Sequence, residues 1–252
     1  MAQEMIAVDE LRTERREFRA SVRAQTQFGI QLRKVARHID DIMRSMAAGA
    51  AEDPARIAAV LRDYARALRP WAETTARLLH QEVARRNAQE WMAAGEAIGR
   101  GLAREIAETP VGHMTRTILE GQVDLITSLP REAAERVHEL AMEARVGGQR
   151  PSALIDEIKN LGDITRNRAM LIARTEVART ASVITQARAQ SAGSTHFVWR
   201  TSRDNNVRPS HRRLEGKIFR WDDPPISDLP DYRSLPGQIF RCRCTAQPIL
   251  PD

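Results

Sequence analysis

The sequence has little of what marks several common classes of protein. Its 252 residues include two cysteines, Cys242 and Cys244, and aromatic residues make up only 4%. Two cysteines so close together argue against a disulfide scaffold. No apolar run reaches the length of a membrane span, and residues 1–6 lack a basic-then-apolar secretory signature. We therefore expect a protein without a membrane span that is made and kept in a reducing cytoplasm.

Motifs of the common enzyme classes are missing as well. The chain has no P-loop, no G-x-S-x-G and no H-E-x-x-H, and His211 beside Ser210 lacks an obvious triad. The E-x-E pair of toxin-type ADP-ribosyl transfer sites is absent after the expected strands. A DNA-binding regulator would need a helix-turn-helix, which we do not find. The sequence therefore predicts a protein that is not an enzyme.

Charge and helix-forming residues are abundant. Charged residues make up 29% and hydrophobic residues 42%, as in globular proteins, and Ala, Arg, Glu and Leu favour helices. The net charge of +6 and the pI near 10.1 favour polyanionic partners: nucleic acid, an acidic protein surface or anionic lipid. The alternative is a solvated helical surface, since many charges alternate in sign. A chain of this length forms one large or two modest domains.

The hydrophobic pattern predicts a mainly α N-terminal region followed by a smaller α+β C-terminal domain with a short antiparallel sheet. We place the helical region at 1–128, with residues 1–25 as a solvated helix or flexible arm. The C-terminal domain covers 129–252, with helices to about residue 192 and β structure over 195–250. One apolar stripe indicates the first buried helix face. It consists of Phe28, Leu32, Val35, Ile39, Ile42 and Met46.

Proline and glycine set the expected helix boundaries after that stripe. Pro54 starts a helix behind an Asp N-cap, and Pro70 should kink or break it. Pro130 starts a separate helix. Gly162 stops a short one, after which residues 166–191 form a long helix with an inner apolar face.

After residue 193 the pattern changes from that of a helix to that of a strand. We expect strands over 195–200, 217–221 and 238–245, because each is rich in β-branched or aromatic residues. A loop rich in Pro, Asp and Ser separates the last two. The third predicted strand carries both cysteines.

Cys242 and Cys244 are the centre of one candidate site. On a strand, a spacing of two places both sulfurs on the same face, where they could bind one metal together with His211 and with Asp204 or Asp231. Cysteine and histidine are the ligands that structural zinc prefers, and zinc would stabilise a β region with few strands. However, C-x-C is not the usual C-x2-C knuckle, and no fourth ligand is evident. The alternative is two buried thiols in a reduced core.

Eight arginines of the β region, interspersed with Trp and Phe, form a second candidate site. They are Arg200, Arg203, Arg208, Arg212, Arg213, Arg220, Arg241 and Arg243. Arginine among aromatic residues suits phosphate backbones and stacking, and equally an acidic protein surface. Solvated strand faces are the alternative. On the long helix, Arg174 and Glu176 are more simply explained as residues that pin the helix to the β region than as catalytic groups.

Several short motifs resemble those of one family in their order and spacing. They are Ile172-Ala-Arg-Thr-Glu-Val-Ala-Arg179, Trp199, Asp204-x-x-Val-Arg-Pro-Ser-His211, Leu214-x-Gly216-Lys-x-Phe219, Asp222-Asp-Pro-Pro225, Pro236-Gly237 and Cys242-Arg-Cys244. Together they resemble the head-morphogenesis, or minor head, family of tailed bacteriophages and prophages, typified by the F protein of phage Mu. The resemblance extends over about residues 130–250. It marks Arg174, Glu176, Trp199, Asp204 and Gly216 as structural motif residues.

The resemblance implies a minor head protein, a structural virion component present in few copies. The predicted partners are the portal protein, the major capsid or scaffold protein and double-stranded DNA, contacted through the eight arginines. The predicted location is the head interior or the portal vertex, with oligomers only in the assembled particle. Neither a catalytic activity nor a cofactor is implied.

Two alternatives stay open at the sequence level. Many members of the family carry a cysteine pair where this chain has Arg208 and His211, so the resemblance by itself implies no complete metal site. Zinc is expected only from the residue types at His211, Cys242 and Cys244. The alternative function is a metal-dependent nucleic-acid enzyme or toxin that uses these three residues.

Overall fold

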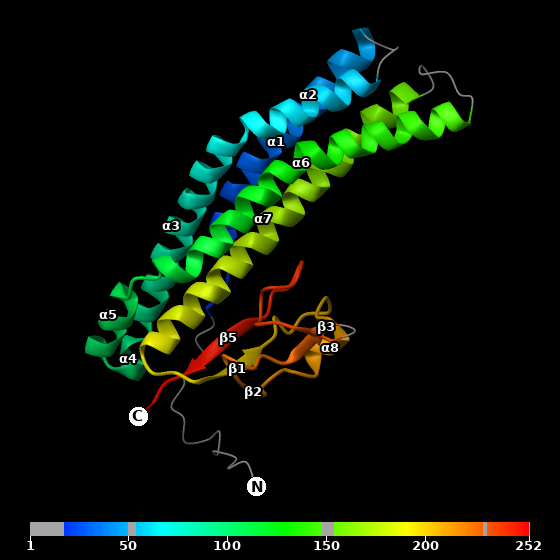
Figure 1. Ribbon diagram of the computed structural model, residues 1–252. Helices are drawn as coiled ribbons and strands as arrows, with labels where there is room; N and C mark the ends of the chain where they lie inside the picture. The colour runs from blue at the N-terminus through cyan, green and yellow to red at the C-terminus, as the bar shows by residue number, and fades with distance from the viewer. Residues whose placement is uncertain (1–17, 50–53, 148–153, 229–230, 252) are drawn as a thin grey trace. The chain divides into compact units, whose positions relative to one another are not determined.

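A computed structural model describes residues 18–49, 54–147, 154–228 and 231–251 (Figure 1). The predicted fold class is confirmed, because helices precede a C-terminal region with short antiparallel sheets. The helices are α1 (Val22–Gly49), α2 (Pro54–Ala67), α3 (Arg69–Ala93), α4 (Gly95–Ile98), α5 (Arg100–Glu108), α6 (Gly112–Val146), α7 (Ile155–Ser191) and α8 (Pro209–Arg212). The strands are β1 (His196–Arg200), β2 (Ile218–Arg220), β3 (Ile226–Asp228), β4 (Tyr232–Arg233) and β5 (Thr245–Ile249). Among the described residues, none of the helices combines the length and the apolar character that a membrane crossing requires.

The chain forms two compact units that are interleaved along the sequence. The helical unit contains residues 22–81 and 116–177, and the α+β unit contains the described residues up to Ser21 together with 82–115 and 178–251. Helices α3 and α7 each run from one unit into the other. The boundary predicted at residue 128 lies within α6. The division at that point follows the sequence motifs and stays a prediction.

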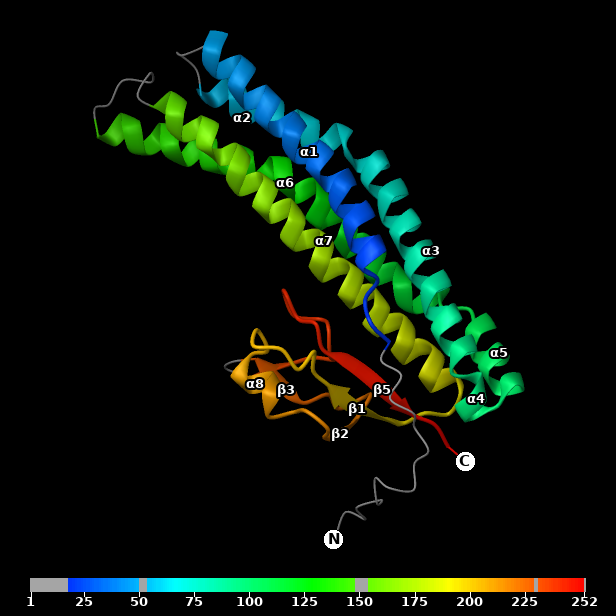
Figure 2. The ribbon, with the colours of Figure 1, turned by 180° about the vertical axis from the view of Figure 1, so that it is seen from behind.

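In the helical unit, α1, α2, α6 and the adjoining parts of α3 and α7 lie side by side (Figures 1 and 2). The apolar stripe predicted for α1 is its buried face. Its members Phe28, Leu32, Val35 and Ile39 are buried, while Ile42 and Met46 lie half-buried at its margin. Met43, which the stripe did not include, is buried as well. His38 and Tyr64 join α1 to α2 through an edge-on ring contact with centroids 4.6 Å apart. The 3.6-residue period therefore identified the packed side of α1.

Two of the predicted helix boundaries are wrong, and a third is confirmed. The helix break near Pro70 is confirmed, since α2 ends at Ala67 and α3 begins at Arg69. Gly162 does not stop a helix, because α7 continues through it and the Asp40 side chain of α1 occupies the space that a Cβ would need. Pro130 lies inside α6 rather than at a helix start. A proline costs the helix one hydrogen bond, and the burial of Leu129 before it and Ala134 after it offsets this loss.

In the α+β unit, a three-stranded antiparallel sheet has the order β2-β1-β5. The central strand β1 pairs Phe197 with Phe219 of β2 and Trp199 with Ala246 of β5. Strands β3 and β4 form a separate hairpin. The third predicted strand, 238–245, is wrong: residues 239–242 form turns, and β5 begins only at Thr245.

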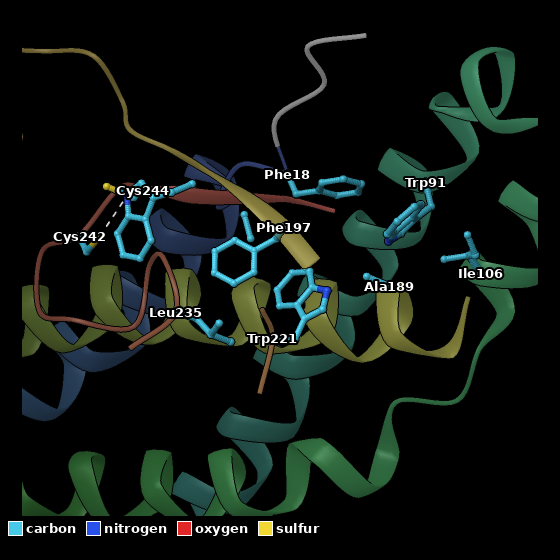
Figure 3. Packing of buried hydrophobic residues seen from close by; sticks show 11 residues of the cluster. Phe18, Trp91, Ile106, Ala189, Phe197, Trp221, Leu235, Cys242 and Cys244 are labelled. Carbon is cyan, nitrogen blue, oxygen red and sulfur yellow. Dashed lines mark hydrogen bonds between the residues drawn. The ribbon is translucent and has the colours of Figure 1, made fainter. Parts of the chain in front are cut away.

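The core of the α+β unit is built around aromatic side chains from distant parts of the chain (Figure 3). Phe197 packs on Trp221 with ring centroids 4.5 Å apart, and Phe18 packs on Trp91 at 4.7 Å. The Trp221 indole N–H donates to Ser194 Oγ at 3.0 Å, so this buried ring keeps a polar partner. The predicted N-terminal arm falls mostly on residues 1–17, which lie outside the described residues, whereas Phe18 is part of this core.

A buried polar network links α3 and α7 within the same unit. The Arg188 guanidinium, 5% exposed, donates to Asn87 Oδ1 at 2.8 Å and to the Ala84 carbonyl at 3.1 Å. Asn87 in turn donates to Thr185 Oγ1 at 2.8 Å. Burial lowers the pKa of Arg188, and the neutral oxygens around it compensate for part of its lost hydration.

Candidate metal centre

His211, Cys242 and Cys244 come together in the α+β unit although they lie on separate segments. Their nitrogen and sulfur atoms all lie within 4.8 Å of one another, and His211 Nδ1 is 3.5 Å from each sulfur. The three residues are 2%, 5% and 6% exposed. Among the described residues, these three side chains are the group close enough together to bind one metal ion. Asp204 and Asp231 are not members of it. The two aspartates considered as ligands are therefore not part of the cluster.

The short helix α8 holds His211 in the protein interior. Pro209 begins the helix, and the His211 carbonyl accepts a hydrogen bond from the Leu214 amide at 3.0 Å. The Trp199 ring meets the imidazole edge-on at a centroid distance of 5.4 Å. Among the described residues, Nε2 of His211 has no hydrogen-bond partner. The polar contacts of the ring are therefore those of Nδ1 with the two sulfurs.

A tight turn rather than a strand presents the cysteines. Gly237 has a φ of +85°, and a side chain there would press on the Ala178 and Cys244 carbonyl oxygens at 3.3 Å. Arg241, immediately before Cys242, has a φ of +60°. The amides of Gly237 and Cys244 both donate to Cys242 Sγ at 3.4 Å. The chain thus wraps around one sulfur, which an extended strand would not do (Figure 3).

This environment separates the acidities of the two thiols. The pKa of Cys242 is lowered, chiefly because the Cys244 thiol donates a hydrogen bond to it; burial opposes the shift, and His211 adds to it. The pKa of Cys244 is raised because it is the donor to the Cys242 thiolate and because it is buried. Two sulfurs and one imidazole without a carboxylate are a donor set for borderline or soft metal ions.

Comparison with known proteins identifies the part of the chain that contains this cluster. Residues 135–247 match the family described as phage Mu protein F like protein. This segment is Mu F-like. An uncharacterized protein of Haemophilus influenzae is 36% identical over 132 residues, which cover 52% of this chain and 28% of that protein. The chain thus spans little more than a quarter of that relative's length. No solved structure matches the chain.

The family resemblance predicted from the motifs is therefore confirmed for the Mu F-like segment. All three residues of the buried cluster lie within it, as do the five predicted motif residues. Trp199 belongs to the aromatic core, and Gly216, at a φ of +75°, donates its amide to the Trp199 carbonyl at 2.9 Å. Arg174 and Glu176 lie on the part of α7 that belongs to the helical unit, so their predicted role in pinning the helix stays a prediction.

Several arginines of the Mu F-like segment fasten the cysteine turn to its own unit. Arg208 donates to the Phe240 carbonyl at 2.7 Å, and Arg179 donates to the Gln238 carbonyl at 3.1 Å. Arg243 pairs with Asp204 at 2.6 Å, while Asp204 also accepts the Asn206 amide at 2.9 Å. The pKa of Asp204 is lowered mainly by that amide and also by Arg243. These contacts hold both sides of the turn that carries the cysteines.

Other members of the predicted arginine set also have partners inside the protein. Arg203 pairs with Glu215 at 2.9 Å, Arg200 lies 3.9 Å from the same carboxylate, and Arg220 pairs with Asp222 at 2.7 Å. The remaining members are Arg212, which donates to the Val207 carbonyl at 3.4 Å, and the exposed Arg213 and Arg241. Their role in binding DNA or a portal stays a prediction.

Arg179 and Glu215, neither of which was predicted as a site residue, hold this region together. Arg179 reaches the cysteine turn from α7. Glu215 accepts the Thr201 amide at 2.6 Å as well as the arginine contacts. Burial raises the pKa of Glu215, but the hydrogen bonds from Thr201 and Arg203 outweigh it and leave that pKa below its ordinary value. Both residues lie within or beside the motifs that carry the resemblance, which was the only sequence signal for them.

Proposed function

We propose that this chain is a minor structural protein of a phage or prophage head. The observation that carries the proposal is the match of residues 135–247 to the phage Mu F-like family, which is a family of head proteins. We place the protein in the virion, at the head interior or the portal vertex. The chain spans 28% of its relative's length, so we propose its partners from the surfaces of this chain alone.

Burial of the cysteine and histidine cluster favours this structural role over a metal-dependent nuclease or toxin. A catalytic zinc site keeps one coordination position open to substrate or water. Here the three side chains are at most 6% exposed, and no acidic side chain of the described residues joins the cluster. The cluster therefore suits the interior of a folded domain better than a reaction centre.

The first proposed partner is the portal protein. Specific protein interfaces bury extended areas with an apolar core and a polar rim. The long helices α1, α6 and α7 carry the exposed apolar side chains Ile30, Met142 and Ile164, and α6 and α7 also carry the first part of the Mu F-like segment. We propose that the helical unit supplies the specific contact with the portal or a capsid protein.

The second proposed partner is double-stranded DNA. Carboxylates already neutralise part of the charge of Arg203, Arg220 and Arg243. These three guanidinium groups therefore attract phosphate less strongly than unpaired ones would. The exposed Arg213 is the member best placed for phosphate. Such contacts would be weak, independent of sequence and sensitive to salt.

A binding experiment over a salt series tests the proposal. The full chain is immobilised and offered the portal protein of the same phage genome at about 0.05 to 1 M salt, a range over which exposed charges become screened. We expect the portal to be retained at high salt, because a packed interface is insensitive to screening. Absence of binding to portal, capsid protein and DNA at every salt concentration would contradict the proposal.

Matched charge reversals separate the two partners. Arg213→Glu alters the Mu F-like segment, and Arg62→Glu alters an exposed residue of α2. Arg213→Glu should weaken DNA binding and reduce the slope against log salt by roughly one, whereas Arg62→Glu should leave DNA binding nearly unchanged. Equal losses in both variants would show that DNA contacts are not concentrated in the β region.

A further inference from the structure

We propose that His211, Cys242 and Cys244 bind one zinc ion, through Nδ1 of the histidine and both sulfurs, and that this ion fixes the cysteine turn against α8. The inference rests on the cluster itself and does not depend on a role in a phage head. The residue types suggested such a site, but the strand geometry first invoked for it is wrong.

The distances within the cluster fit a tetrahedral ion. Zinc bonds of about 2.3 Å to sulfur and about 2.0 Å to nitrogen, meeting at about 109°, place the nitrogen and sulfur about 3.5 Å apart. Nδ1 of His211 lies 3.5 Å from Cys242 Sγ and 3.5 Å from Cys244 Sγ. Two equal distances of this size are required of one nitrogen that shares a metal with two sulfurs.

The turn also provides the surroundings of a metal thiolate. The Gly237 and Cys244 amides point at Cys242 Sγ from 3.4 Å, and such N–H donors stabilise sulfur that carries negative charge. Gly237 can make this approach because its φ of +85° suits a residue without a side chain. A cation between the sulfurs and the imidazole would balance the charge that these donors favour.

The secondary-structure elements around the cluster are short, so an internal cross-link would stabilise them. Strands β2, β3 and β4 contain only three, three and two residues, and α8 contains four. Elements this short bury little surface of their own, and a structural zinc ion contributes directly to the folding of small β regions. Arg208 and Arg243 hold the turn from outside, and the ion would hold it from inside.

The donor set indicates which ion the site takes. Two sulfurs and one imidazole without a carboxylate select zinc, or a similar borderline ion, over magnesium and calcium, which require oxygen ligands. The described residues supply three ligands, so a buried water molecule completes the tetrahedron, and the burial of all three side chains keeps substrates in solution away from that position. Two hydrogen-bonded thiols without any metal are the competing arrangement, and metal analysis distinguishes the two.

The test uses the purified full chain. Under reducing conditions the wild-type protein should contain about one zinc per chain, and removing it with a strong chelator should lower Tm by about 5 °C or more. Cobalt added to the stripped protein should show the charge-transfer absorption of a thiolate-bound ion. The proposal is overturned if the chain binds neither zinc nor cobalt while both thiols are reduced and if the chelator leaves its Tm unchanged.

Variants locate the ion. Cys242→Ser, Cys244→Ser and His211→Asn should each lose zinc, while His138→Asn, at an exposed histidine of α6, should retain it. Stoichiometric zinc that persists in the cysteine variants would place the ion elsewhere and refute the site. If these variants do not fold, the cobalt spectrum and the chelator response of the wild-type chain decide alone.

Discussion

Half-buried charged side chains determine how the α+β unit responds to pH. Glu90 on α3 is the clearest case: its side chain is 18% exposed, and its Oε1 lies 3.3 Å from Arg86 Nε. Burial raises the pKa of Glu90 to about 7, and the attraction of Arg86 recovers only part of that shift. The folded protein therefore holds a proton on Glu90 that the unfolded chain releases near its ordinary pKa of 4.5.

The sign of the resulting pH dependence follows from linkage. Since the folded pKa lies above the unfolded one, the contribution of Glu90 to stability falls as the pH rises from about 4.5 to about 7. Glu90→Gln should remove this fall and stabilise the protein at pH 8 by up to about 3 kcal/mol, with little change at pH 4.5. Urea unfolding of the wild type and the variant at the two pH values measures this change in the free energy of unfolding. Glu105→Gln, at an exposed glutamate of α5, is the control and should change little; an equal gain there would contradict the assignment to Glu90.

The sequence predicted the three cluster residues correctly, because histidine and cysteine are metal ligands. The strand geometry that was expected to bring the two sulfurs together was wrong. Cys242 and Cys244 were assigned to a strand because residues 238–245 include β-branched and aromatic side chains. The positive φ of Arg241 prevents that strand. A positive φ at a residue other than glycine cannot be predicted from the residue type. Likewise, the Arg208 contact with the Phe240 carbonyl depends on a turn that only the folded chain defines.

At the scale of elements, two helix glycines in the helical unit have opposite surroundings. Gly162 of α7 faces Asp40 of α1, whose side chain occupies the space of a Cβ, and Asp40 is also held by Arg44 at 2.9 Å. Gly121 of α6 has no atom within 4 Å of the position a Cβ would take. Both lie inside long helices, so intrinsic helix propensity favours alanine equally at both.

This contrast predicts opposite effects of one substitution. Gly121→Ala should stabilise the protein by roughly 0.5–1 kcal/mol, the ordinary gain of alanine over glycine in a helix. Gly162→Ala should destabilise it by about 1–3 kcal/mol, because Asp40 or the helix must shift. Thermal and urea unfolding of the two single variants measure the difference. A stabilising Gly162→Ala would show that α1 and α7 do not pack as described.

Element boundaries were harder to predict than element types for a physical reason. The buried face of α1 was predicted because its apolar residues repeat with the helical period over many turns. A helix start at Pro130 and a helix stop at Gly162 were expected from local propensity, which amounts to only a few kcal/mol. Packing on both sides of those positions outweighs it, and packing partners distant in sequence are not visible in a local window.

At the scale of the whole molecule, composition predicted a helical, basic protein with a smaller β-containing part, and this fold class is confirmed. The interleaving of the two units was not predicted, because it depends on α3 and α7 each contributing to both. The short ordered motifs of the Mu F-like segment carried the functional inference. They did so because their order and spacing reflect one fold, whereas each motif alone is common.

Analysis of purified particles tests the central claim most directly. Heads from a host that carries the corresponding phage or prophage genome are separated from soluble protein by sedimentation, washed in high salt and quantified by mass spectrometry. A minor head protein should sediment with the particles at a few copies per portal, far below the major capsid protein. Its complete recovery in the soluble fraction, at every stage from the immature to the packaged head, would contradict the account.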